Sequence, residues 1–307
     1  MSSLTNILYF QAGLGILANT FLLCFYTFTI LGHRSKPMDL ISCQLTFAHI
    51  SFLLTGGDNW LAVILESLNI ENDFKCKAIF YISRVMRGLS ICITCLLSVS
   101  QAVTISPHTS LLAKFKHKLK TYIIYAVFYI WFFNFLVSSH MLFYVGAFNN
   151  VSETNQMRVT KSCSLFLMNY IISGLIFTVT TFRDVFLVGV MLITNAYIVI
   201  ILFRHQRHCK HLHSIRHLRV SPEKRATQTI LLLVVFFVVM YWVEIIISST
   251  SLLLWMYDPV ILTVQKLVVT AYPTITPLVQ ISSDKRVINV LKNLQSKHTH
   301  IYIKYYV

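Results

Sequence analysis

Long stretches without a charged residue constrain this chain more than any other feature. Uncharged runs of 17 residues or more recur from the N-terminus to residue 283. A helix needs about 20 predominantly apolar residues to cross the hydrocarbon core of a bilayer. Only 12% of the 307 residues are charged, whereas soluble globular domains have about 25%. These runs therefore predict an all-α membrane protein, because the chain has too few charges to cover a soluble surface.

Seven apolar stretches are candidate membrane spans and predict one domain, a seven-helix bundle over residues 1–307. No repeat of 20–50 residues and no linker rich in Gly, Ser or Pro divides the chain. The N-terminus lacks a basic region and a cleavage site, so we expect the first span to act as its own insertion signal. The candidate spans are 7–31, 39–58, 78–104, 120–146, 185–203, 226–255 and 260–282.

Basic residues are unevenly distributed among the segments that join these spans. The segments 33–38, 105–120 and 204–225 and the tail after 282 carry two, four, seven and five Lys or Arg, which is 18 of the 26 in the chain. These segments alternate along the chain, and basic loops collect on the cytoplasmic side of a membrane. The pattern predicts an outside N-terminus and an inside C-terminus. It also explains the net charge of +15 without a nucleic-acid partner.

Residues 162–182 form a further uncharged run of 21 residues, long enough for another span. If this run crossed the membrane, loop 204–225 and the tail would move outside and reverse the distribution of basic residues. The two-residue link Arg183-Asp184 would also have to make a complete turn. We therefore interpret 147–184 as an outer loop whose apolar part could fold over the mouth of the bundle.

Two cysteines, Cys76 and Cys163, are the ones that this topology places outside. That side of a membrane is oxidising, so we expect a disulfide between them. The single N-x-S/T sequon, at Asn150, falls in the same outer loop and is a candidate glycosylation site. One sequon also arises easily by chance, and that alternative stays open.

Three charged residues lie inside the predicted spans at similar depth. Arg84 and Arg87 are three residues apart and share a helix face, roughly 12–17 Å from the outer mouth. Glu244 lies about 20 Å from the outer end of its own span. Charges in a membrane are costly and often functional. Two interpretations stay open, namely a structural ion pair or a polar ligand pocket.

Signatures of catalysis and of metal binding are missing from the sequence. There is no glycine-rich phosphate loop, no H-E-x-x-H and no G-x-S-x-G, so we expect neither an enzyme nor a cofactor. Loop 204–225 contains His205, His208, His211 and His213, but no acidic or cysteine cluster completes a metal site. Its end, Ser221-Pro222-Glu223, is typical of a helix start, so the sixth helix is expected to extend into the cytoplasm, within reach of a partner protein.

Three long stretches of the sequence resemble the vomeronasal type-1 receptors. They are RVMRGLSICITCLLSVSQAVTISP (84–107) followed by LAKFK (112–116), SPEKRATQTILLL (221–233) and AYPTITPLVQISSDKRV (271–287). The resemblance extends over nearly the whole chain. Where ordinary rhodopsin-like receptors carry Asp-Arg-Tyr, this chain has Ser100-Gln101-Ala102, and in place of Asn-Pro-x-x-Tyr it has 276–280, TPLVQ. These departures leave the activation switch unassigned.

The resemblance implies a multi-pass receptor in the plasma membrane of chemosensory neurons. Such a receptor would bind pheromone-like small molecules and activate an inhibitory-class heterotrimeric G protein. We hypothesise a ligand pocket near Arg84, Arg87 and Glu244. Gln101, Lys224 and Arg225 are the residues that we expect to face the G protein.

Two alternative functions compete with this interpretation. A bitter-taste type-2 receptor has similar length and a short N-terminus, but RGLSICITC and SPEKRATQTILLL argue against it. A seven-helix transporter or channel would show inverted halves or a line of polar residues across the whole membrane. The sequence shows neither of these features.

Overall fold

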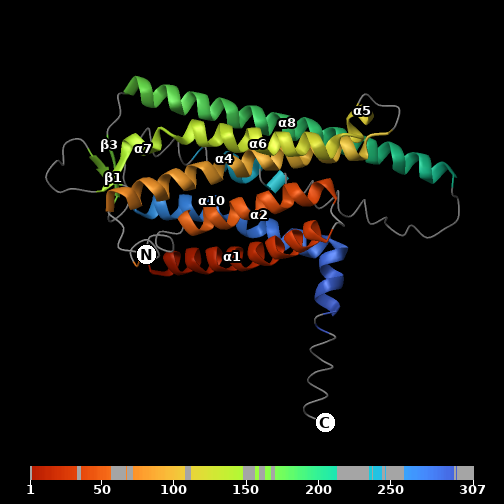
Figure 1. The fold of residues 1–307 in the computed structure, drawn as a ribbon, viewed down its shortest axis with the longest axis horizontal. Coiled ribbons are helices and arrows are strands. Elements are labelled where there is room, and N and C mark those ends of the chain that lie inside the picture. The colour runs from red at the N-terminus through yellow and green to blue at the C-terminus, as the bar shows by residue number, and fades with distance from the viewer. Residues whose placement is uncertain are drawn as a thin grey trace, which may run out of the picture.

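Long helices lie side by side in the computed structural model of the chain, and a small sheet caps one end of the bundle (Figure 1). The structure describes residues 2–32, 36–56, 67, 72–107, 112–147, 156–158, 163–166, 170–212, 235–236, 238–243, 246, 259–293 and 295. The long helices are α1 (Ser2–Leu31), α2 (Pro37–Gly56), α4 (Asn72–Ile105), α6 (Leu119–Ser138), α8 (Tyr170–Leu212) and α10 (Pro259–Ser283). The short helices α5 (Ala113–Lys116) and α7 (Met141–Tyr144) flank α6.

Five of the described helices are long and apolar enough to cross a membrane. They cover Leu4–Leu31, Pro37–Thr55, Asn72–Ile105, Leu119–Tyr144 and Gly174–Arg204. The outward face of α6 exposes large apolar rings such as Phe128 and Phe132, as a lipid-facing surface does. The prediction of a helical membrane protein is confirmed. Most of the predicted span 226–255 lies outside the described residues, so the count of seven stays a prediction.

A three-stranded antiparallel sheet lies at one end of the bundle, which we call the sheet end. Its strands are β1 (Val145–Ala147), β2 (Gln156–Arg158) and β3 (Cys163–Phe166), in the order β1-β3-β2. Val145 and Met157 both pair with Leu165 across the sheet. The predicted all-α class did not include this sheet. The span predicted to reach residue 146 ends as a long helix at Ser138, and the chain continues through α7 into β1.

The largest departure from the sequence interpretation is helix α8, which runs without a break through Arg183 and Asp184. The prediction that 162–182 forms an outer loop and that the span begins at 185 was therefore wrong. Residues 163–166 form β3, and 170–182 are the first turns of α8. Ile171, Leu175 and Phe182 are exposed on the outside of the bundle, so this segment does not cover its mouth. The two charges looked like a boundary, yet they pair with each other inside the bundle.

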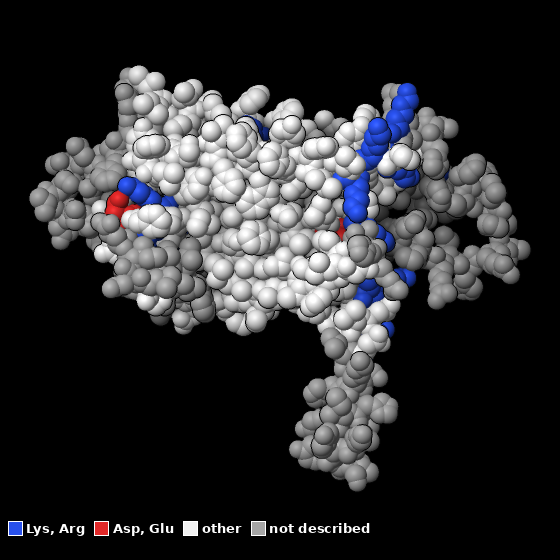
Figure 2. Space-filling model, viewed as in Figure 1, with Lys and Arg blue, Asp and Glu red and all other residues white. Residues whose placement is uncertain are grey.

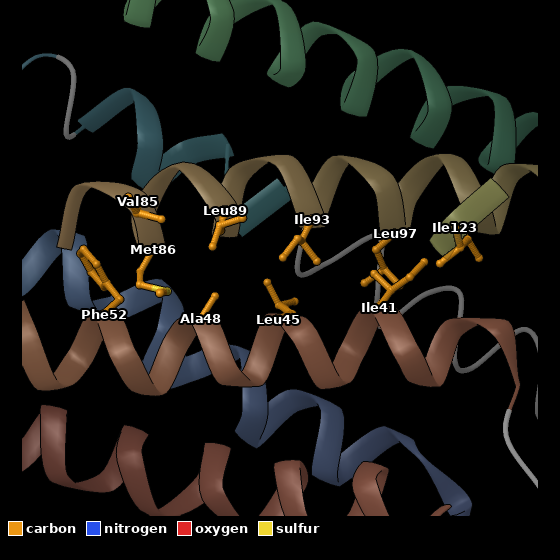
Figure 3. Close-up of a cluster of buried hydrophobic side chains, with 10 residues drawn as sticks. All are labelled: Ile41, Leu45, Ala48, Phe52, Val85, Met86, Leu89, Ile93, Leu97 and Ile123. Carbon is orange, nitrogen blue, oxygen red and sulfur yellow. The ribbon is translucent and has the colours of Figure 1, made fainter. Parts of the chain in front are cut away.

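Helix α4 is the centre of the bundle and the most buried of the five candidate spans. Figure 3 shows its apolar side chains facing those of α2 across a narrow layer. On α2 the buried positions recur every three or four residues, which puts them on one helix face. The layer consists of Ile41, Leu45, Ala48 and Phe52 of α2, Val85, Met86, Leu89, Ile93 and Leu97 of α4, and Ile123 of α6.

Helices α1 and α10 approach closely along a polar stripe on α1. Gln11, Gly15 and Asn19 follow one another at four-residue spacing, so they share one face. A Cβ atom at Gly15 would lie 2.7 Å from Thr274 Oγ1 and 2.8 Å from Leu53 Cδ1. The close approach therefore depends on a residue without a side chain at position 15.

Asn19 stabilises the part of α10 that two prolines interrupt. Pro277 has no N–H group, so the carbonyl of Pro273 loses its ordinary helical donor. The buried Asn19 Nδ2 donates to that carbonyl oxygen at 2.8 Å and to the Gly15 carbonyl oxygen at 2.8 Å. The side chain of α1 thus replaces the missing backbone hydrogen bond, as a helix inside a membrane requires.

Asn19→Leu should lower the free energy of unfolding by about 1–3 kcal/mol, because it leaves the Pro273 carbonyl unpaired in an apolar interior. Asn195→Leu is a matched control, since the buried Asn195 Nδ2 has no partner within the described part of the chain. That control should change stability little. Unfolding of the purified protein in mixed micelles measures both effects, and equal losses would contradict the role of Asn19.

Candidate functional site

A small cavity lies between α2, α4, α10 and the described part of 226–255. Small-molecule sites are mostly apolar with a few polar groups, and the lining of this cavity has that composition. Arg87, Ser90, Tyr241 and Tyr272 supply the polar groups of this cavity. Its apolar lining consists of Phe52, Ile91, Met240, Val268, Val269 and Pro273. A lining of this kind suits a small apolar molecule that carries a polar group.

A buried polar network ties the cavity wall to three helices. His49 Nε2 on α2 lies 3.1 Å from Ser90 Oγ on α4, and the His49 ring meets the Tyr272 ring edge-on at 5.4 Å. Thr94 Oγ1 donates to the Ser90 carbonyl oxygen at 2.7 Å and lies 3.1 Å from the Tyr272 hydroxyl. The network joins α2, α4 and α10 directly beside the two cavity residues Ser90 and Tyr272.

The structure brings one of the three residues of the predicted pocket to the cavity. Arg84 and Arg87 are both half-buried on α4, and Arg87 lines the cavity whereas Arg84 does not. Glu244 lies outside the described residues, although Tyr241 of the same predicted span reaches the cavity. The pocket around Arg84, Arg87 and Glu244 and the pairing of these charges therefore stay predictions.

A second charged group, which sequence reasoning had placed in the outer loop, lies buried between α4, α6 and α8. Arg183 Nη2 and Nε lie 2.6 Å and 2.7 Å from Asp184 Oδ1. Arg183 Nη1 also donates to Asn134 Oδ1 of α6 at 3.4 Å. Asn134 and Asp184 are both buried, and Arg183 keeps only 16% of its side chain exposed. A paired charge of this kind can remain inside a membrane span.

Gly88 of α4 provides the space for this group. A Cβ atom there would lie 2.1 Å from Asn134 Oδ1 and 3.4 Å from Arg183 Nη1, so a side chain would displace the Asn134 amide that contacts Arg183. One sequence signal could have revealed the pair. Adjacent opposite charges between two apolar runs can neutralise each other within a single helix.

At the sheet end, a disulfide joins Cys76 of α4 to Cys163 of β3. The two cysteines form a small buried cluster with Val145 of β1. Asp73 Oδ1 also accepts a hydrogen bond from the Ala147 backbone N–H at 3.1 Å. These contacts attach the sheet to the first turns of α4. The candidate glycosylation site Asn150 lies outside the described residues.

An ion cluster ties the start of α2 to the residues that directly follow α10. Arg286 Nη1 and Nη2 donate to the two carboxylate oxygens of Asp39 at 3.1 Å and 2.8 Å, and Nη2 also contacts Asp284 Oδ2 at 2.9 Å. Asp39 is 2% exposed. The cluster fixes the helical residues 285–293, here named the tail helix, which turn away from the bundle at this end (Figure 1).

The three residues expected to face a G protein are only partly placed. Gln101 is buried near the end of α4, so it is not available to a partner in this structure. The reason is that this end of α4 still packs against α8, where Ser106 Oγ lies 3.0 Å from the Tyr197 hydroxyl. Lys224 and Arg225 lie outside the described residues.

Charged side chains gather at the two ends of the bundle, and the middle of the face in Figure 2 shows almost none. Basic residues dominate the end opposite the sheet, which we call the basic end. Exposed members there are Lys114, Lys116, Lys118, Lys120, Arg204, Lys285 and Lys292. An uncharged belt between two charged ends is the surface that a bilayer requires.

Comparisons with known proteins connect this architecture to a receptor family. Residues 2–293 match the vomeronasal organ pheromone receptor family. The chain is 38% identical to vomeronasal type-1 receptor 100 of Rattus norvegicus over 95% of this chain and 90% of that protein. It is 38% identical to receptor 90 of the same species, over 94% and 93% of the two chains. Vomeronasal type-1 receptor 45 of Mus musculus is 35% identical over 95% and 92%.

Proposed function

The chain belongs to the vomeronasal organ pheromone receptor family, and from this membership we propose that it detects a pheromone-like small molecule in the cavity beside Arg87. The bound receptor would then activate an inhibitory-class heterotrimeric G protein. The observation that carries the proposal is the cavity itself, which is mostly apolar and contains one arginine and three hydroxyl-bearing side chains. An apolar ligand with one polar group fits such a lining.

We also propose seven spans, with the sheet end outside and the basic end in the cytoplasm of chemosensory neurons. The basic residues at one end support this orientation, and the disulfide at the other end suits an oxidising compartment. The described part of 226–255 is helical, and its Tyr241 packs against α4, α8 and α10. That placement supports a further span between α8 and α10.

Signalling requires a ligand that binds the active bundle better than the resting one. The cavity touches α4, α10 and the 226–255 segment at once, so a ligand there can change how these helices pack. On α10 it touches Tyr272 and Pro273, next to the backbone that Pro277 weakens. A bend of α10 at this point would move the helix ends at the basic end, where Lys224, Arg225 and their neighbours would contact the G protein.

Arg87→Gln should shift the ligand concentration for half-maximal G-protein activation by about tenfold to a hundredfold, because a charged hydrogen bond contributes about 1.5–3 kcal/mol. Arg84→Gln is the matched control, since Arg84 occupies the same helix one turn away but does not line the cavity. The measurement is a dose response to hits from a library of volatiles and steroids, with surface expression followed in parallel. An unchanged response of the Arg87 variant would exclude this cavity as the site.

A further inference from the structure

The hydroxyl protons beside the cavity can be assigned from their partners. Thr94 has one hydroxyl proton, which it donates to the Ser90 carbonyl oxygen at 2.7 Å. A carbonyl oxygen only accepts, so this donor is fixed. The contact of 3.1 Å between Thr94 Oγ1 and the Tyr272 hydroxyl must then take its proton from Tyr272. Tyr272 therefore directs its proton to Thr94 of α4.

The tautomer of His49 determines whether the Ser90 hydroxyl accepts or donates the hydrogen bond between them. The imidazole is 1% exposed, its Nε2 contacts Ser90 Oγ at 3.1 Å, and its Nδ1 has no partner among the described residues. If Nδ1 carried the proton, a buried N–H group would lack an acceptor, which is rarer in proteins than an unpaired acceptor. The proton therefore belongs on Nε2, and His49 donates to Ser90.

Ser90 then accepts from His49 and keeps its own proton to donate. Within the described part of the chain, Ser90 Oγ has no other hydrogen-bond partner, and its side chain lines the cavity. Arg87, three residues earlier, lines the same cavity from the same face of α4. The α4 wall thus presents the Ser90 hydroxyl as a donor to whatever occupies the cavity, and a buried donor without an acceptor costs about 1–3 kcal/mol.

We propose that the ligand carries a hydrogen-bond acceptor, such as a carbonyl or ether oxygen, that binds the Ser90 hydroxyl, and that His49 is the positioning residue for this contact. The apolar body of the ligand would lie against Phe52, Ile91 and Val269 of the same cavity. This inference rests on the proposed function in one respect, namely that the cavity is the ligand site. It adds the chemical class of the ligand group and the residue that recognises it.

The test uses the full chain in lipid nanodiscs and two probes, a cyclic ketone and the cycloalkane of the same ring size. The ketone should bind the wild type about threefold to tenfold more tightly than the cycloalkane, the contribution of one neutral hydrogen bond. Ser90→Ala should remove this preference. Ser98→Ala is the matched control, because Ser98 is buried on the same helix but bonds the Thr94 carbonyl and does not line the cavity.

Variants of His49 separate positioning from a general loss of structure. His49→Leu should reduce the ketone preference, whereas His49→Gln should restore most of it because the Gln amide can donate near the position of Nε2. A merely structural defect would weaken the binding of both probes equally. Equal affinity of the wild type for the two probes, or no binding of either, overturns the proposal, as does a ketone preference that survives Ser90→Ala.

The binding assay contains no G protein, so the two proposals can fail separately. A ketone preference that depends on Ser90, in a protein that never activates a G protein, would overturn the proposed signalling role alone. Conversely, if ligands without an oxygen acceptor activate the wild type and Ser90→Ala equally, the inference about Ser90 fails and the receptor function stands.

Discussion

Replacing Arg183 with leucine should lower the free energy of unfolding by about 3–5 kcal/mol, the cost of removing one partner from a buried ion pair. The substitution leaves the Asp184 carboxylate, 9% exposed, without its guanidinium between α4, α6 and α8. The double variant Arg183→Leu/Asp184→Leu should be more stable than the single one, because no unpaired charge remains. Unfolding in mixed micelles and the amount of receptor at the cell surface measure both variants.

Lys77→Leu provides the matched control for this prediction. Lys77 pairs with Asp73 at 2.7 Å, but 34% and 44% of their side chains are exposed, and exposed pairs contribute about 0–1 kcal/mol. Similar losses of unfolding free energy in Arg183→Leu and Lys77→Leu would mean that Arg183 lies in the lipid headgroups, where an outer loop would place it. A double variant less stable than Arg183→Leu would also contradict the buried pair.

Arg286→Leu should cost about 2–4 kcal/mol, less than a fully buried pair because 35% of the Arg286 side chain is exposed. This loss of stability arises because the buried Asp39 carboxylate loses both hydrogen bonds from the guanidinium. It keeps the hydrogen bond from the Lys36 backbone N–H, at 2.7 Å. The hydrogen bonds to Asp39 also raise the pKa of Arg286 above its ordinary value, so the guanidinium stays charged at physiological pH. The stability of Arg286→Lys should fall between those of the wild type and Arg286→Leu, since an ammonium cannot form the paired contacts of a guanidinium.

Hydrogen exchange of the tail helix tests the same cluster locally. Without Arg286, amide protection of residues 285–293 should fall, because only the buried contact of Val287 with Leu22 and Tyr26 of α1 would then hold the described part of this helix. Lys285→Leu is the control, as Lys285 is exposed next to Arg286, and surface substitutions usually change stability by about 0.5 kcal/mol or less. Unchanged protection in Arg286→Leu would show that other contacts hold the tail helix.

Much of the architecture could be predicted because membrane insertion depends on local sequence. A long uncharged segment is apolar whatever its neighbours are, so the helices α1, α2, α4 and α10 begin and end within about six residues of the bounds expected for spans. Cys76 and Cys163 could be paired because the expected topology left two cysteines outside, and these two lie together at the sheet end.

The position of α8 could not be predicted in this way, because the cost of a charge in a membrane depends on its partners. Arg183 and Asp184 read as a boundary between loop and span. They lie within one helix because Asn134 of α6 contacts Arg183 and Gly88 of α4 leaves room for both side chains. These residues are about 50 and 95 positions away in the chain, beyond the reach of any local pattern.

By itself the sequence determined the helical membrane class, the receptor family and the uneven distribution of basic residues, since each is a property of consecutive residues. Tertiary structure alone decided which polar groups could be buried. It brought Asn19 to the carbonyl that Pro277 leaves unpaired and Arg286 to Asp39, and it placed His49 against Ser90. Each of these groups would be too costly in an apolar interior without a partner from a distant helix, and the fold supplies that partner.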